Sequence, residues 1–342
     1  MKRWPGFLAF LMLFAPAAAA ADQLFDIEPV VPGVWIALAR PQYIINCNAA
    51  IIELDDGLLV VDTHTKPSAA RALIEQIKTV SPKPVKFVVD SHFHADHFQG
   101  NAAYPSAWPG GIEVISSEAT REGIERRGIP RLKNQIVGVP KDIERLKKDM
   151  EKAIGPEQRA KIGEDLRQAE AYLAELKTMQ AVLPSLTFDS SMIIHRRSRS
   201  VHILWLGKAH TDGDIWIYLP REKVIATGDA LHTFTPYLGD GYPYDWMKTL
   251  EAAEALDFEH VIPGHGPVLH GKGQFRAWRE YLTDLMAETA SAYAEGATMA
   301  DTIKRVAPGL IEKHKGSMPS TFPTDITGNI QKAYRVVSGA TE

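Results

Sequence analysis

Cysteine is nearly absent from this chain, and its scarcity excludes several classes of protein. Cys47 is the single cysteine among 342 residues, so neither an intramolecular disulfide nor a metal site built from clustered cysteines can form. An excess of positive charge is also missing, because 38 lysine and arginine residues stand against 42 aspartate and glutamate residues. The resulting net charge of −4 disfavours a protein held on nucleic acid by phosphate contacts, and we expect no nucleic-acid partner.

Long apolar runs are missing as well, except at the amino terminus. Lys2 and Arg3 precede an apolar run at 7–14, and small residues follow at 17–21. This order is typical of a secretory signal peptide, and the run is shorter than the ~20 residues that span a bilayer. We therefore expect residues 1–21 to be removed, which leaves a periplasmic or secreted protein without a membrane anchor.

Beyond the signal peptide, strand patterns alternate with helix patterns. Apolar stretches of strand length recur at 34–39, 49–54, 58–61, 85–89, 192–195, 201–206, 215–219 and 224–227. Helical spacing of apolar residues is found at 68–80, 245–256 and 274–293. This alternation predicts an α/β or α+β domain with covered sheets, which we place at 22–296.

Two further helical segments are predicted outside this alternation. A highly charged segment contains two series of apolar residues at helical spacing, separated by Gly155-Pro156. The first series is Ile143, Leu146, Met150 and Ile154, and the second is Ile162, Leu166, Ala169, Leu173 and Leu176. We expect a helical hairpin inserted at about 140–183, and favour a solvated hairpin packed on the body over a lid or dimer arm. The tail at 297–342 is predicted to be a helical extension, to which the sequence assigns no function.

The chemistry of the chain is concentrated in the run Ser91-His92-Phe93-His94-Ala95-Asp96-His97, which follows an apolar strand. His92 and His94 are two residues apart, so they point the same way from an extended backbone. Asp96 is expected to continue that face, and His97 to lie beside it in the following turn. Imidazole nitrogen and carboxylate oxygen suit zinc and similar divalent metals. The run therefore predicts a metal site at the end of a buried strand.

Three later residues supply what such a site still needs. His210, Asp229 and His265 each follow a predicted strand, in loops that contain glycine. Loops at strand ends are where sheets commonly present functional side chains. We therefore expect these three residues to complete the metal site.

Taken in this order, the H-x-H-x-D-H run, the later histidine, the Gly-Asp after a strand and the Pro-Gly-His-Gly sequence resemble the metallo-β-lactamase-fold hydrolase superfamily. The resemblance extends over residues 25–295 and implies a four-layer αββα sandwich with metals at one edge of the sheets. It implies a first metal bound by His92, His94 and His210, a second bound by Asp96, His97 and His265, and a bridging ligand, Asp229. Asp62 resembles an aspartate that supports the family's metal ligands.

The resemblance also implies the cofactors and the reaction. Two divalent ions ~3.5–4 Å apart can share a water and lower its pKa. Zinc is the expected metal, and iron and manganese are the alternatives. The resulting hydroxide would attack the carbonyl of a small-molecule ester, thioester, lactone or lactam. The chain has no G-x-S-x-G motif, and Cys47 lies far upstream of the ligands, so we expect no covalent intermediate. Asp96 is expected to orient the nucleophile or to carry a proton.

Other functions remain open at this stage. Typical metallo-β-lactamases lack a bridging aspartate at the position of Asp229, which disfavours a β-lactamase, although export suits one. A mononuclear iron enzyme similar to sulfur dioxygenases and a non-catalytic metal-binding or sensor protein are the further alternatives.

The aromatic loop after Asp229 is expected to shape the pocket, with His232 or Tyr237 in position to hold an oxyanion. The oligomeric state is not predicted.

Overall fold

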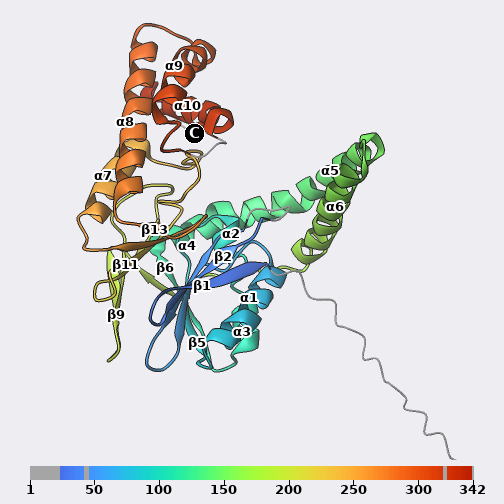
Figure 1. Cartoon of the computed structure of the whole chain (residues 1–342), viewed down its shortest axis with the longest axis vertical. Coiled ribbons are helices and arrows are strands. Elements are labelled where there is room, and N and C mark those ends of the chain that lie inside the picture. Colours follow the sequence, from blue (N-terminus) through green and yellow to red (C-terminus); the bar gives the residue numbers. More distant parts are fainter. Residues whose placement is uncertain (1–23, 42–45, 319–321, 341–342) are drawn as a thin grey trace, which may run out of the picture.

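The computed structural model describes residues 24–41, 46–318 and 322–340. The predicted signal peptide at 1–21 lies outside the described residues. Two β-sheets pack face to face, and helices cover the outer face of each (Figure 1). Within the described residues, no helix combines the length and the apolarity that crossing a membrane requires.

The first sheet has seven strands in the order β1-β2-β3-β4-β5-β6-β7. Their bounds are β1 Phe25–Val31, β2 Val34–Ala39, β3 Ala49–Glu53, β4 Leu58–Val61, β5 Val85–Val89, β6 Glu113–Ser117 and β7 Leu186–Phe188. The first four strands pair antiparallel, and β4 to β7 pair parallel. The second sheet has the order β13-β12-β11-β10-β9-β8. Its strands are β8 Ser191–His195, β9 Ser200–Leu204, β10 Trp216–Leu219, β11 Val224–Gly228, β12 His260–Pro263 and β13 Leu269–His270.

The alternation of side chains along the strands builds the layers. In β10, Ile217 points into the apolar layer between the sheets, whereas Trp216 and Tyr218 pack against the helices outside, as the two-residue repeat of a strand requires. The outer face of the first sheet is covered by α1 (Pro67–Val80) and α3 (Ala103–Ala107). The outer face of the second is covered by α7 (Pro243–Glu254) and α8 (Gly273–Ala294). The expected four-layer αββα sandwich is confirmed.

Parallel pairing brings the predicted functional residues to one edge. The last residues of β4 and β5, Val61 and Val89, are paired, and so are Gly228 of β11 and Pro263 of β12. Functional loops follow each of these strand ends, since Asp62, His92, Asp229 and His265 come directly after them or within three residues.

A helical hairpin projects from the body (Figure 1). It consists of α5 (Ile129–Lys152) and α6 (Pro156–Leu176), with Gly155 between them. The chain reaches α5 through α4 (Glu118–Gly123) and a π-helical turn, η1 (Ile124–Gly128). The helix therefore begins well before residue 140, where the hairpin was expected to start, although the predicted break at Gly155-Pro156 is present.

The predicted apolar series of the hairpin is correct except at its end. Ile143 and Leu146 pack against Ala169 and Leu176, but Ile154 is 89% exposed. Its inclusion was wrong because α5 ends at Lys152, so the helical spacing no longer applies at this position.

Strands β1 and β6 were also not predicted. Strand β1 is partly exposed on an edge of its sheet and lacks a continuous apolar run.

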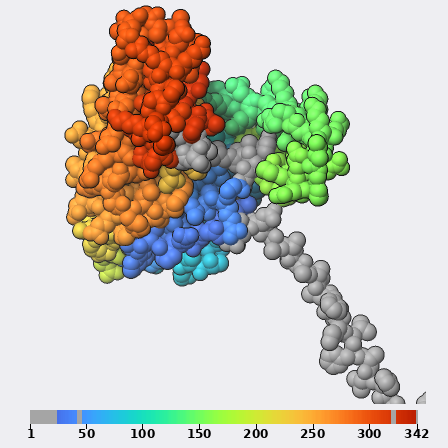
Figure 2. All heavy atoms as spheres, turned by 45° about the horizontal axis from the view of Figure 1, so that its top comes forward, coloured from blue at the N-terminus to red at the C-terminus, as the bar shows by residue number. Residues whose placement is uncertain are grey.

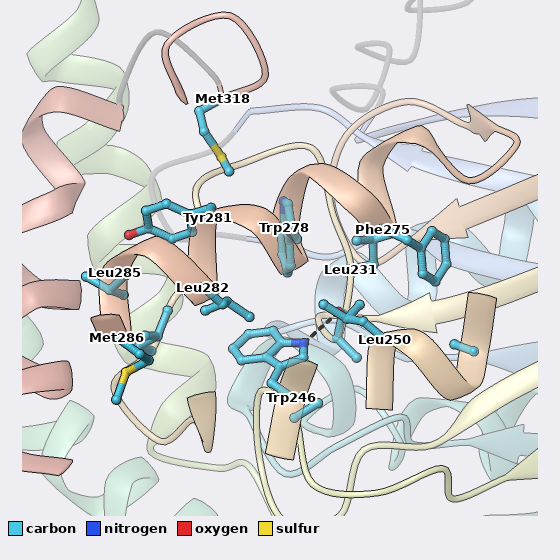
Figure 3. Close-up of a cluster of buried hydrophobic side chains, with 14 of the residues drawn as sticks. Leu231, Trp246, Leu250, Phe275, Trp278, Tyr281, Leu282, Leu285, Met286 and Met318 are labelled. Atoms are coloured by element: carbon cyan, nitrogen blue, oxygen red, sulfur yellow. Dashed lines mark hydrogen bonds between the residues drawn. The ribbon is translucent and has the colours of Figure 1, made fainter. Parts of the chain in front are cut away.

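The carboxyl-terminal helices share one core with the second sheet. Helices α9 (Met299–His314) and α10 (Phe322–Val337) pack on α8. Figure 3 shows aromatic and aliphatic side chains of this core, including Trp246 of α7, whose Nε1–H donates to the backbone oxygen of Ala230 at 3.0 Å. The loop after Asp229 is thereby attached to the helical layer.

We expect Leu282→Ala to lower the free energy of unfolding by about 2–5 kcal/mol, because Leu282 is fully buried in this core and its removal leaves a cavity. Ile154→Ala is the matched control, an aliphatic truncation at an exposed site, expected to change stability by no more than about 0.5 kcal/mol. Urea unfolding of both variants checks this. Equal losses would contradict the placement of these two residues.

Candidate metal centre

The predicted metal-binding run begins two residues after β5 and extends into a short helix, α2 (Ala95–Phe98). His94 keeps an extended backbone, with φ −71° and ψ 149°, but Asp96 lies in α2. The expectation that Asp96 continues an extended face was therefore wrong. The helical turn is held from the neighbouring loop, because the carbonyl of His97 accepts hydrogen bonds from the Thr63 backbone N–H at 3.0 Å and from its hydroxyl at 3.3 Å.

The seven residues predicted as metal ligands converge at the sheet edge. They form three overlapping groups whose candidate ligand atoms lie within 4.8 Å of one another, namely His92 with His94 and His210, Asp96 with His97 and His265, and His92 with His97 and Asp229. None of the seven lies apart from the others. Residues separated by more than 170 positions in the chain thus meet in one cluster that could hold metal ions.

Asp229 joins the two groups of three. Its Oδ1 lies 3.5 Å from His97 Nε2 and 3.3 Å from His265 Nε2, whereas its Oδ2 lies 3.7 Å from His210 Nε2. Asp96 Oδ2 approaches the same His97 and His265 nitrogens, at 3.4 and 3.3 Å. The carboxylate of Asp229 therefore presents one oxygen to each side, as a bridging ligand must.

The imidazoles are fixed by their outward-facing nitrogens. His94 Nε2 bonds Asp240 Oδ2 at 2.7 Å, and His97 Nδ1 bonds Asp62 Oδ2 at 2.8 Å. His92 Nδ1 lies 3.0 Å from the Ser91 hydroxyl, and His210 Nδ1 lies 3.1 Å from the backbone oxygen of Tyr237. Such partners hold the ring orientation and tautomer of metal-binding histidines, and they leave the opposite nitrogen of each ring directed into the cluster.

Asp62 has a strained backbone that its contacts maintain. Its φ is +66°, a region that residues other than glycine seldom adopt. Its side chain accepts hydrogen bonds from the Ser91 backbone N–H at 2.8 Å and from the Ser91 hydroxyl at 2.9 Å, in addition to His97. These contacts explain why the strained conformation persists, and they support the role predicted for Asp62.

Burial and the neighbouring charges divide the histidines into two kinds. Burial lowers the pKa of His210 to about 3 and holds that of His92 well below its usual value, so both rings are neutral. Burial also opposes the charged forms of His97 and His265, but the nearby carboxylates outweigh it and raise both pKa values, that of His265 to about 10. A cation bound among these carboxylates would compete with those two protons.

Several atoms of the cluster have no hydrogen-bond partner among the described residues. They are His92 Nε2, His97 Nε2 and Asp229 Oδ1, all fully buried. Buried polar atoms without a partner carry a substantial energetic cost, and metal coordination would satisfy all three. The donor set, made of imidazole nitrogens and carboxylate oxygens, fits zinc and related divalent ions.

Five residues of the cluster line a cavity of about 840 Å³, and the part that they line is its floor: His94, Asp96, His210, Asp229 and His265. The remaining walls come from α5, from the loop at 232–239 and from α10. The predicted pocket residues His232 and Tyr237 both line it; His232 is buried, whereas Tyr237 is 56% exposed. In Figure 2 the carboxyl-terminal helices, in orange and red, lie on one side of the view, and the α5–α6 hairpin, in green, lies on the other.

Asp240 and Arg131, which the sequence pattern did not indicate, also hold the cluster from outside. Asp240 accepts hydrogen bonds from His94 and from both terminal nitrogens of Arg131, at 2.8 and 2.7 Å. Only its position in the loop after Asp229 could have drawn attention to it. His64 is fully buried beside the only cysteine, with its Nδ1 3.4 Å from Cys47 Sγ.

We expect Gly264→Ala to weaken metal binding roughly 10–100-fold, the range found when the support of a ligand is lost. A Cβ at this position would lie 2.1 Å from Asp229 Oδ1 and 2.7 Å from the Gly228 backbone carbon, so the carboxylate must move. Gly273→Ala is the control, because a Cβ there meets nothing within 4 Å. Chelator competition measures the affinity, and equal affinities in the two variants would contradict this account of Asp229.

Comparison with known proteins connects this geometry to a family. A family model of the metallo-β-lactamase superfamily matches residues 44–265. The chain is 23% identical over 276 residues to a linear primary-alkylsulfatase of Pseudomonas sp. (strain ATCC 19151), covering 75% of this chain and 49% of that one. It is 22% identical over 227 residues to a metallo-β-lactamase type 2 of Bacillus sp. (strain 170), covering 65% and 67%.

A solved structure shows the same fold. The stereoselective inverting sec-alkylsulfatase Pisa1 from Pseudomonas sp. superposes with a TM-score of 0.64 at 18% identity, over 93% of this chain and 51% of that one. The chain thus spans about half the length of the alkylsulfatases that it matches. Since the family model extends over more than half of the chain and includes all seven clustered residues, the chain belongs to the metallo-β-lactamase superfamily.

Proposed function

We propose that this protein is an exported, binuclear metal-dependent hydrolase of small-molecule esters or related compounds. The observation that carries the proposal is the pair of ligand sets that share Asp229 on the floor of the cavity. One ion would be held by His92, His94 and His210 and the other by Asp96, His97 and His265, with Asp229 between them. Two divalent ions there would supply an activated water and a Lewis acid. Zinc is the proposed metal, with iron or manganese as alternatives.

Two residues of the chain are assigned roles in the reaction besides metal binding. Asp96 lines the cavity, and its neighbours His97 and His265 hold its pKa well below the usual value despite burial, so it is ionised and can orient the attacking water. His232 Nδ1 accepts a hydrogen bond from the Phe234 backbone N–H at 3.0 Å, and burial lowers the pKa of this ring to about 4. The neutral ring therefore carries its proton on Nε2, which we assign to stabilise an oxyanion on the substrate.

The bond that is cleaved has two candidates. The first is a carbonyl ester, thioester, lactone or lactam, as the family resemblance implied. The second is an alkyl sulfate, which two of the reported relatives are named for hydrolysing.

A specific feature of the cavity favours the sulfate ester. Lys332 and Arg335 of α10 lie on the cavity wall. Asp325 lies on the same wall, but the guanidinium of Arg335 forms no ion pair with it or with any other described residue. Phe234 and Tyr237, 45% and 56% exposed, give the cavity an aromatic side. Cations beside aromatic rings suit a substrate that combines an anionic group with an apolar chain.

Substrate screening of the zinc-loaded protein tests the proposal. Turnover of a p-nitrophenyl ester, a thioester, a lactone, nitrocefin and a medium-chain alkyl sulfate is compared before chelation, after chelation and after zinc is restored. We expect hydrolysis of at least one substrate, its loss on chelation and its recovery with zinc. Oxygen uptake with a persulfide would favour the iron dioxygenase alternative instead, and a metal-free protein without any turnover would favour a binding or sensor role.

Asp96→Asn is expected to lower kcat by about 10²–10⁴-fold at saturating metal, because the amide can neither hold nor accept a proton as the carboxylate does. Asp257→Asn is the control, because this side chain is 78% exposed and does not line the cavity, and it is expected to leave kcat within about threefold. Metal content and kcat are measured together. An Asp96→Asn protein with two ions and full activity would refute this role.

The export signal and the division of the chain are part of the proposal. The charged, apolar and small-residue order at 1–21 supports removal of this segment outside the cytoplasm. We assign the catalytic domain to 22–296, with the helical insertion beginning at α5 (Ile129–Lys152) and not at about 140, and the extension to 297–342. Amino-terminal sequencing of protein recovered from the periplasm or the medium tests the cleavage site.

A further inference from the structure

The loop at 236–240 connects the candidate metal centre to helices distant in the sequence. On its inner side, the Tyr237 carbonyl faces His210 Nδ1 at 3.1 Å, and Asp240 Oδ2 faces His94 Nε2 at 2.7 Å. Two of the three residues assigned to the first ion are thus oriented by this one loop.

The outer side of the same loop is bonded to α10. Asn329 Nδ2 donates to the Pro236 carbonyl at 2.8 Å and to the Tyr281 hydroxyl of α8 at 2.8 Å. Lys332 Nζ donates to the Gly239 carbonyl at 3.2 Å. Both side chains are buried, 4% and 8% exposed. Tyr281 belongs to the buried core that Figure 3 shows, so the loop is tied through Asn329 to the apolar core of the helical layer.

The second ligand set has supports of its own. The backbone N–H and the hydroxyl of Thr233, upstream of the loop at 236–240, both donate to the His265 carbonyl at 3.3 Å. His97 is held by Asp62, after β4. The loop that carries His265 is held by Asn48, whose Nδ2 donates to the Pro263 carbonyl at 3.0 Å and to the Gly266 carbonyl at 2.7 Å. Asn48 precedes β3 and Asp62 follows β4 of the first sheet, whereas Asn329 and Lys332 belong to the carboxyl-terminal extension.

We propose that α10 positions the ligands of the first ion, with Asn329 and Lys332 as positioning residues that act through the loop at 236–240. This inference rests on the proposed binuclear site and assigns a role to the extension, which sequence analysis left without one. Loss of these contacts frees the loop, so that His94 and His210 are less well oriented. Metal affinity then falls at the first site and is unchanged at the second.

Cobalt titration of the metal-free full-length chain tests the proposal without measuring activity. The variant is Asn329→Ala with Lys332→Met, which removes the three donated bonds but keeps most of the lysine stem. Asp240→Asn and Asp62→Asn provide reference spectra for loss of the first and second sites. We expect the double variant to bind cobalt roughly tenfold more weakly at the first site, the lower end of the range for outer partners of ligands, with second-site affinity unchanged.

Ile330→Ala is the matched control, because Ile330 is a fully buried neighbour on the same helix that belongs to the apolar core. It is expected to lower the unfolding midpoint while both cobalt affinities stay at the wild-type value. If the double variant does not fold, Lys332→Met alone is titrated, with Lys332→Arg expected to restore the affinity by returning a donor.

The outcomes separate this inference from the proposed function. Wild-type affinity at both sites in the folded variant, or equal weakening at both sites, overturns the positioning role and leaves the binuclear centre intact. A wild-type chain that binds fewer than two cobalt ions overturns the binuclear centre itself, and this inference with it.

Discussion

The structure depends on keeping two carboxylates, Asp96 and Asp229, ionised inside a buried cluster of imidazoles. Burial alone would raise the pKa of both, yet the imidazoles of His97 and His265 hold both values well below the usual range. An uncompensated buried charge is costly, so the cluster requires positive partners, either protons on these rings or bound cations. The unpartnered nitrogens and the unpartnered Asp229 oxygen indicate that the arrangement suits cations better than protons.

The sandwich meets this requirement by placing four strand ends at one edge. Parallel pairing of β4 with β5 and of β11 with β12 delivers Asp62, the histidine run, Asp229 and the His265 loop to the same place. The outward-facing nitrogens are then fixed from several directions, by Asp62 after β4 and by Asp240 in the loop after Asp229. Helices distant in the sequence complete the arrangement, because Arg131 of α5 and Asn329 of α10 contact this loop or its aspartate. The cluster is therefore a product of the whole fold.

Much of this could be predicted from local pattern. The histidine run directly follows an apolar strand, and the Gly-Asp and Pro-Gly-His-Gly sequences also sit at strand ends, where functional loops are common. The division of these residues into two ligand sets with a bridging aspartate was implied by the family resemblance. Asp240, Asn329 and Lys332 could not be predicted in the same way, because their roles come from tertiary contacts that no spacing encodes. The helix at Asp96 and the exposure of Ile154 were mispredicted because propagation of a regular spacing ignores where an element ends. The sulfate-ester candidate was not foreseen, since α10 completes the cavity only after folding.

Anomalous diffraction from zinc-soaked crystals of the full-length chain tests the central claim most directly. The account predicts two metal peaks on the cavity floor, one beside His92, His94 and His210, the other beside Asp96, His97 and His265, with Asp229 contacting both. A single peak, or two peaks of which Asp229 contacts only one, would contradict it.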